Sequence, residues 1–156
     1  TAVTNTTTTV YIVRHGEKAD AAPTDRDPAL SAEGEARAQE LVKYLAGQKI
    51  DAVYATPYKR TQSTVQPLAK KHGLTVQIYD PKDNAALKEQ VLQGGAGKTI
   101  VVAGHSNTIL AIVEALGAQK PFAEVPESKY DHIFKVTIKA DGTATVAAAT
   151  YGKATN

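Results

Sequence analysis

Two histidines in matching sequence contexts are the residues best suited to do chemistry in this chain. His15 belongs to Arg14-His15-Gly16-Glu17 and follows the apolar run of residues 10–13, whereas His105 belongs to Gly104-His105-Ser106 and follows the apolar run of residues 100–103. Short apolar runs predict buried strands, and the ligands of open α/β sheets bind beyond the carboxyl ends of the strands. We therefore expect both imidazoles to reach one pocket.

Two arginines are expected beside the same pocket. Arg14 directly precedes His15, and Arg60 lies in the first turn of a helix predicted to begin at Pro57, just after the strand-like run of residues 52–55. A guanidinium group presents paired N–H donors that match the oxygens of a phosphoryl group. Two imidazoles and two guanidiniums together predict an anion site with a phosphoryl group as its ligand.

The composition is typical of one globular domain. The chain has 156 residues, of which 42% are hydrophobic and 22% charged, and its formal net charge is +2. This charge is too small to favour nucleic acid as a partner. The absence of cysteine excludes disulfides, thiolate nucleophiles and cysteine-ligated metals, and no apolar stretch is long enough to span a bilayer.

The first residues differ in character from the rest. Residues 1–9 are polar and rich in threonine, so we expect them to be disordered or tether-like, with residues 10–151 forming a single domain. A start of this kind resembles the segment left after removal of a signal peptide. The sequence therefore favours export to the periplasm or cell envelope, with a cytoplasmic location as the alternative.

Strand and helix patterns alternate along the chain. This rhythm predicts a three-layer α/β/α sandwich with a mostly parallel sheet. Residues 18–30 contain two prolines and no periodicity, which predicts a long functional surface loop. Strands over 133–139 and 143–150 flank Asp141-Gly142, a turn signal that predicts an antiparallel hairpin at the edge of the sheet. Helices are predicted after Ser31, from Pro57 to His72, around 85–92, and after Ser106 or Asn107.

Four motifs follow one another from about Val10 to Leu116. In chain order they are Arg14-His15-Gly16-Glu17 after a strand, Leu30-Ser31 with Gly34 and Arg37 opening a helix, Thr56-Pro57 leading to Arg60-Thr61 and Thr64, and Gly104-His105-Ser106 before a helix. Together they resemble the histidine phosphatase superfamily, which has the phosphoglycerate mutase-like fold.

The resemblance implies a role for each matched residue. His15 would be the nucleophile and would form a phosphohistidine that water hydrolyses. Arg14, Arg60, His105 and Ser106 would bind the phosphate, with a protonated His105 opposing the charge that its equatorial oxygens gain. The flanking arginines should disfavour protonation of His15. The reaction would need no metal and no cofactor.

The acid that protonates the leaving group has no clear match. The mutase-like branch carries a mid-chain glutamate in a Leu-x-Glu setting that this chain lacks. Glu17 is our preferred candidate because it is nearest in sequence to the nucleophile, with Asp80, Asp83 and Asp131 behind it. A compact branch, typified by phosphohistidine phosphatases, also lacks the mid-chain acid, and the short segment between the motifs favours that branch.

The sequence as a whole predicts a metal-independent phosphatase acting on phosphomonoesters or phosphohistidine. Its partner would be a phosphorylated small molecule, glycan or protein. The alternative is a non-catalytic phosphate- or phosphoprotein-binding module on the same fold. A mutase is less expected because the insertion that would enclose its pocket is missing. The glycine-rich residues 93–99 are no P-loop, since Leu92 stands where glycine is needed and a strand follows.

Overall fold

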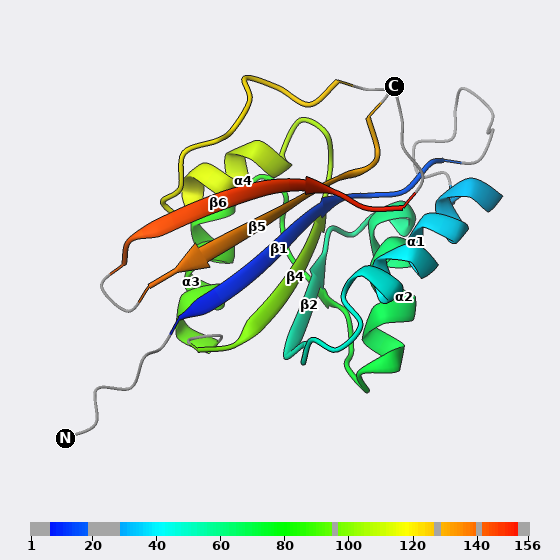
Figure 1. The fold of residues 1–156 in the computed structure, drawn as a ribbon, viewed down its shortest axis with the longest axis horizontal. Helices are drawn as coiled ribbons and strands as arrows, with labels where there is room; N and C mark the ends of the chain where they lie inside the picture. Colours follow the sequence, from blue (N-terminus) through cyan, green and yellow to red (C-terminus); the bar gives the residue numbers. More distant parts are fainter. Residues whose placement is uncertain (1–6, 19–28, 95–96, 127–128, 140–141, 153–156) are drawn as a thin grey trace.

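A six-stranded sheet forms the centre of the molecule (Figure 1). The computed structural model describes residues 7–18, 29–94, 97–126, 129–139 and 142–152. The strand order is β3-β2-β4-β1-β5-β6. In chain order the strands are β1 (Thr8–Arg14), β2 (Ala52–Ala55), β3 (Gln77–Ile78), β4 (Thr99–Gly104), β5 (His132–Ile138) and β6 (Ala144–Thr150).

The strands β1 to β4 are parallel, and the last two form an antiparallel hairpin at one edge. β1 pairs in parallel with β4, and β2 pairs in parallel with β4 and β3. β5 runs antiparallel to both β1 and β6. The predicted mixed sheet with its edge hairpin is therefore confirmed. The register also matters for function. Arg14 pairs with Gly104, and the residue that follows each of them is a histidine, so the two histidines leave the sheet side by side.

Helices cover both faces of the sheet, as expected for a three-layer sandwich. α1 (Ala32–Tyr44) and α2 (Lys59–Lys71) pack on one face, and α3 (Asn84–Gly94) and α4 (Ile109–Ala115) pack on the other (Figure 1). Because successive side chains of a strand point to opposite faces, Val10 and Ile12 of β1 enter the core under α4 while Tyr11 and Val13 enter the core under α1 and α2. This explains the uninterrupted apolar run of a central strand.

Several element boundaries differ from the predicted ones. β1 begins at Thr8, within the segment expected to be tether-like. α2 begins at Lys59, with Tyr58 at its N-cap, and Pro57 precedes the helix. α4 begins at Ile109 and has Thr108 as its N-cap, so neither Ser106 nor Asn107 caps it. Ser31 caps α1 as predicted, since its Oγ accepts a hydrogen bond from the Gly34 N–H at 3.1 Å.

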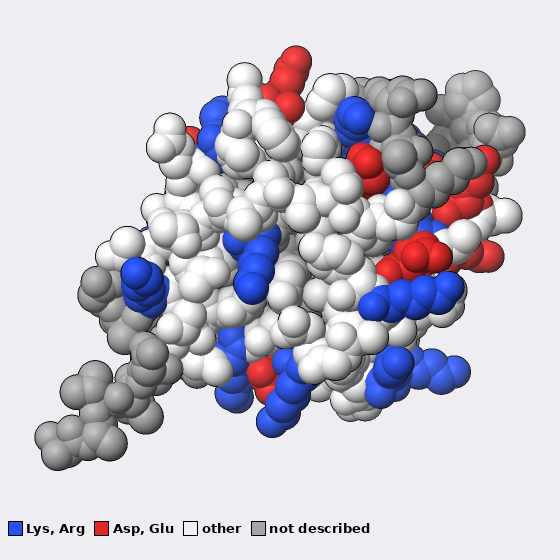
Figure 2. Space-filling model, in the orientation of Figure 1, with Lys and Arg blue, Asp and Glu red and all other residues white. Residues whose placement is uncertain are grey.

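Some predictions fall outside the described residues. They concern residues 1–6, most of the predicted loop over 18–30, and Asp141 of the hairpin turn. Within the part of the chain that is described, no helix is long and apolar enough to cross a membrane. The surface drawn in Figure 2 carries charges of both signs, with acidic side chains gathering on the side where α1 lies.

Candidate active site

His15 lies at the carboxyl end of β1 and is held by backbone groups. Its side chain is buried, with the residue 4% exposed, and its backbone N–H donates to Gly104 O at 3.0 Å. The imidazole Nδ1 lies 2.8 Å from Gly16 O. A carbonyl oxygen can only accept, so Nδ1 carries the hydrogen and the lone pair of a neutral ring is on Nε2. The contact therefore leaves Nε2 as the nucleophilic atom.

Two glycines keep the segment after His15 in place. The Gly16 N–H donates to Thr64 Oγ1 at 2.8 Å, which ties the segment to α2. A Cβ atom on Gly16 would lie 2.9 Å from Gly34 O, and a Cβ atom on Gly34 would overlap Glu17 O. Both positions therefore need glycine so that the backbone after β1 can approach the first turn of α1.

His105 is held by side-chain hydroxyls in place of backbone carbonyls. Its Nε2 lies 3.0 Å from Thr56 Oγ1, which lies 2.6 Å from Thr61 Oγ1. The Thr61 hydroxyl donates to the carbonyl oxygens of Thr56 and Tyr58. Because its one hydrogen is used there, Thr61 accepts from Thr56, and Thr56 accepts from His105. The chain of hydroxyls thus fixes the hydrogen of His105 on Nε2.

The two histidines meet as predicted. Their ring centroids are 5.4 Å apart, with 65° between the ring planes. Ser106 follows His105 in the turn between β4 and α4 and is partly buried. His105 O accepts from the backbone N–H groups of Thr108 and Ile109, which closes the turn that leads into α4.

Each arginine of the predicted site lies over a tyrosine ring. The Arg14 Cζ is 4.0 Å from the centroid of Tyr130, and the Arg60 Cζ is 4.5 Å from the centroid of Tyr58. Arg14 is buried and its Nη1 also donates to Lys129 O at 2.7 Å. Cation–π contacts of this kind hold a guanidinium in a defined plane.

The same two tyrosines contact the histidines and were missed by the sequence analysis. Tyr130 lies 6.1 Å from the His15 ring, and Tyr58 lies edge-on to the His105 ring at 5.1 Å. Tyr58 stands inside the matched motif at residues 56–61 and could have been noticed there. Tyr130 follows no motif, and only the tertiary structure brings it to β1.

Burial keeps both imidazoles neutral at neutral pH. Burial and, after it, the charges of Arg14, His105 and Arg60 lower the pKa of His15 to about 3. Burial followed by the charges of Arg60 and Arg14 lowers the pKa of His105 to about 4. The expected effect of the arginines on His15 has the predicted direction. The expected protonation of His105 does not hold for the site as it stands. The negative charge of a bound phosphoryl group would raise the pKa of His105 again.

Glu17 forms a two-pronged ion pair with Arg37. Its Oε1 accepts from Arg37 Nε at 2.8 Å, and its Oε2 accepts from Arg37 Nη2 at 3.0 Å. Burial raises the pKa of the Glu17 carboxyl, but the hydrogen bonds and charge of Arg37 outweigh it and leave the pKa lowered. Arg37 also donates to Tyr151 O at 3.1 Å. This arrangement argues against the predicted acid role, since an ionised carboxylate has no proton to donate.

The other three candidate acids have structural partners. Asp80 Oδ1 accepts from the Lys82 N–H at 2.8 Å, and Asp83 Oδ1 accepts from the Ala86 N–H at 3.0 Å, so both stabilise the turn into α3. Asp131 is buried and helps to raise the pKa of Arg37, as Glu17 does. Within the described residues, no group of three or more His, Asp or Glu side chains is arranged to hold a metal ion.

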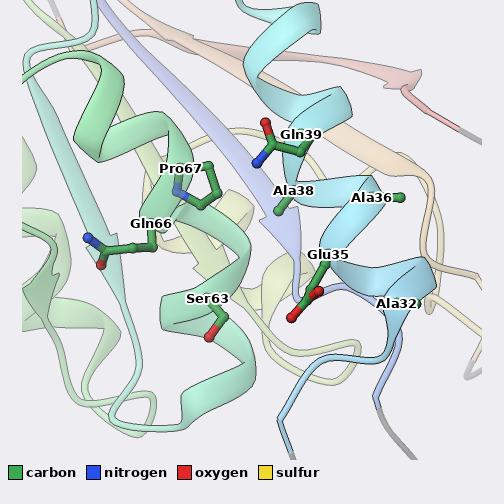
Figure 3. Close-up of a pocket in the computed structure, with 8 residues that line it drawn as sticks. All are labelled: Ala32, Glu35, Ala36, Ala38, Gln39, Ser63, Gln66 and Pro67. Atoms are coloured by element: carbon green, nitrogen blue, oxygen red, sulfur yellow. The ribbon is translucent and has the colours of Figure 1, made fainter.

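Two hollows differ in their relation to the histidines. A cavity of about 250 Å³ adjoins His105 and is lined by Tyr58, Arg60, Pro81, Lys82, Asn107 and Thr108. A larger groove of about 560 Å³ lies between α1 and α2 and is lined mainly by small or neutral side chains (Figure 3). Neither histidine nor either site arginine lines this groove, so the smaller cavity is the one that can serve the site.

Sequence comparisons match about half of the chain. The family model of the histidine phosphatase superfamily (branch 1) matches residues 10–81. The uncharacterized protein Rv0525 of Mycobacterium tuberculosis is 42% identical over 80 residues. That alignment covers 47% of this chain and 38% of the relative, so the chain matches well under half of the length of the curated protein.

Solved structures share the fold over nearly the whole chain. The protein histidine phosphatase SixA, complexed with tungstate, is 22% identical with a TM-score of 0.71, over 91% of this chain and 96% of that one. YhfR of Bacillus stearothermophilus is 14% identical with a TM-score of 0.72, over 89% and 95%. The mycobacterial glucosyl-3-phosphoglycerate phosphatase Rv2419c is 13% identical with a TM-score of 0.66, over 93% and 98%. At these identities the likeness concerns the fold.

Proposed function

This chain belongs to the histidine phosphatase superfamily, and on that premise we propose that it is a phosphatase acting through a phosphohistidine on His15. One observation carries the proposal. The Nδ1 hydrogen of His15 is used by Gly16 O, so the Nε2 lone pair is available at neutral pH in a buried site beside two arginines. An imidazole in this state is a competent nucleophile towards phosphorus.

The reaction would proceed in two displacements. The Nε2 lone pair attacks phosphorus, the bond from phosphorus to the leaving group breaks, and the leaving group departs with the electron pair and takes up a proton from the solvent. The oxygen of a water molecule then attacks the same phosphorus, the P–Nε2 bond breaks, and the water gives up a proton as inorganic phosphate forms. Arg14 and Arg60 would bind the equatorial oxygens throughout, and His105 would gain a proton as charge builds on them.

The pairing of Glu17 bears on the substrate class. With its carboxylate held by Arg37, Glu17 is suited to position the segment after His15 rather than to protonate a poor leaving group. Phosphohistidine and phosphomonoesters with good leaving groups need little acid assistance, so we propose them as the preferred substrates. The description of SixA as a protein histidine phosphatase supports the first class, and that of Rv2419c supports a phosphorylated small molecule.

Acid-quench labelling tests the proposal directly. The protein would be mixed with an aryl phosphate that carries a radiolabelled phosphoryl group, in the presence of a chelator, and then quenched. We expect an acid-labile, base-stable label on the parent protein and on His72→Ala, whose histidine caps the far end of α2, but none on His15→Ala. Binding of inorganic phosphate without any label or turnover would favour the non-catalytic binding module instead.

The cellular location is a separate proposal. From the polar, threonine-rich composition of residues 1–9 we propose export to the periplasm or cell envelope, with a cytoplasmic location as the alternative. Fractionation of cells that express the full natural gene product would test this proposal.

A further inference from the structure

The cavity beside His105 offers room for a part of the substrate other than the transferred phosphoryl group. It shares Arg60 and His105 with the phosphate site and extends from them to Lys82 and Asn107. Its volume of about 250 Å³ lies just below the usual range for small-molecule sites, which begins at roughly 300 Å³. The cavity therefore suits a small leaving group and not a folded protein surface.

The charged side chains that line this cavity are all basic. Its lining includes the side chains of Arg60 and Lys82, and none of its lining residues is acidic. In the proposed reaction Arg60 is engaged by the phosphoryl oxygens, so Lys82 is the cation left for a second anion. The carboxylates of Asp80 and Asp83 are nearby in sequence, but each accepts a backbone N–H of the turn.

The turn that carries Lys82 is held in a fixed shape. The Lys82 N–H donates to Asp80 Oδ1 at 2.8 Å, and the Asp83 N–H donates to Asp80 O at 3.0 Å. These bonds keep Lys82 at the rim of the cavity. Asn107, which also lines the cavity, is exposed in the turn after His105 and adds an amide donor.

We propose that this cavity binds the leaving group of the substrate and selects one that bears a second anionic group, either a carboxylate or another phosphate, through Lys82. The inference rests on the proposed phosphatase function and names its substrate class more closely. Tyr58 and Pro81 supply the apolar walls against which the carbon skeleton of such a leaving group would pack. An exposed ammonium group gives a modest and salt-dependent preference.

A matched pair of esters tests this selectivity. Phenyl phosphate and 3-carboxyphenyl phosphate have similar leaving groups and differ by one carboxylate, so the ratio of their kcat/KM values reports the second anionic contact. We expect the parent protein to favour the carboxylated ester and Lys82→Ala to lower the ratio by about two- to fivefold. Lys82→Glu should lower it further, and Lys82→Arg should preserve it. Lys70→Ala, at the far end of α2, is the matched control and should leave the ratio unchanged.

The possible outcomes separate the two proposals. If phenyl phosphate is hydrolysed but the ratio is the same in the parent, Lys82→Ala and Lys82→Glu proteins, the selectivity is absent and this inference is wrong while the phosphatase function stands. If neither ester is hydrolysed and no phosphohistidine forms, both proposals are wrong. A preference that vanishes at high salt and follows the charge at position 82 supports the inference. A diphosphorylated small molecule in place of the carboxylated ester would show which anion is favoured.

Discussion

The two halves of the site hold equivalent residues by different means. On the β1 side, His15 and Arg14 are buried and are fixed by the backbone carbonyls of Gly16 and Lys129. On the β4 side, His105 is only partly buried, is fixed by the Thr56 hydroxyl and borders a cavity. The difference teaches that the half expected to form the covalent bond is rigid and closed, whereas the half expected to bind the rest of the substrate is open to it.

Replacing either arginine by lysine should cause the largest loss of activity, and the loss should differ between the two halves of the site. Arg14→Lys should lower kcat/KM by about a hundredfold, because a lysine cannot reproduce the paired donors or the plane held over Tyr130. Arg60→Lys, at the more open half, should lose about tenfold. Hydrolysis of phenyl phosphate and inhibition by vanadate would be measured for both. Full rate and full vanadate inhibition in Arg60→Lys would remove Arg60 from the site.

Acidification should lower the free energy of unfolding, because both histidines are buried as neutral groups. Since the pKa of His15 is about 3 in the folded protein and its ordinary value is 6.5, the unfolded chain binds a proton between these values that the folded protein does not. The free energy of unfolding should therefore fall as pH falls from 6.5, by about 2 kcal/mol for His15 at pH 5.

Urea unfolding of the parent and of His15→Asn at pH 7 and pH 5 measures this contribution. The variant should lose less stability on acidification than the parent does. The corresponding contribution of His105 should stop growing below its pKa of about 4, while that of His15 continues to about pH 3. An identical pH dependence in His15→Asn and the parent would contradict the burial of this imidazole as a neutral group.

Glu17→Gln should lower activity by removing the ion pair that supports the β1 half of the site, while the reacting groups stay the same. The amide keeps the size of the side chain but loses the charge paired with Arg37, so we expect kcat/KM to fall by about tenfold. If Glu17 only positions the segment after His15, alkyl and aryl phosphates should suffer equal losses. A much larger loss on the alkyl ester would restore Glu17 as the general acid. Glu35→Gln, in the exposed first turn of α1, is the matched control.

Thr56→Val should produce the smallest effect, confined to the β4 half. It removes the hydroxyl that accepts from His105 Nε2 while preserving the shape of the side chain. We expect kcat to fall by about threefold to tenfold, with Thr56→Ser restoring it, because orientation of the ring is lost and the ring itself is kept. Nitrogen NMR of the imidazole should show the tautomers of His105 mixing in Thr56→Val. An unchanged tautomer signal would mean that other contacts orient the ring.

Much of the fold and the two histidines could be predicted because their signals are local. The apolar runs before His15 and His105 identify two strands, and parallel pairing then brings the residues after them together. The start of α2 was misjudged because the Thr56 hydroxyl is used by Thr61 and His105 and does not cap the helix. A tertiary contact of this kind cannot be predicted from the residue types around position 56.

The contacts that define the state of the site are long-range and could not be predicted. Arg14 reaches Lys129 across 115 positions, and Tyr130 arrives with that segment. The pairing of Glu17 with Arg37 depends on how closely α1 approaches the end of β1. The neutrality of His105 depends on burial, which no motif records.

The backbone carbonyl of Tyr151 makes the geometry of the site depend on a residue that is synthesised after both histidines. This residue follows β6, the last strand of the sheet, and accepts from the Arg37 that holds Glu17 beside the nucleophile segment (Figure 1). Its own N–H donates to Asp131 O at 2.9 Å. A growing chain would present both histidines to the solvent long before this brace exists. Competence of the first motif thus depends on a residue 114 positions beyond Arg37, so a chain cut short before it would carry every reacting group without the support that orients them.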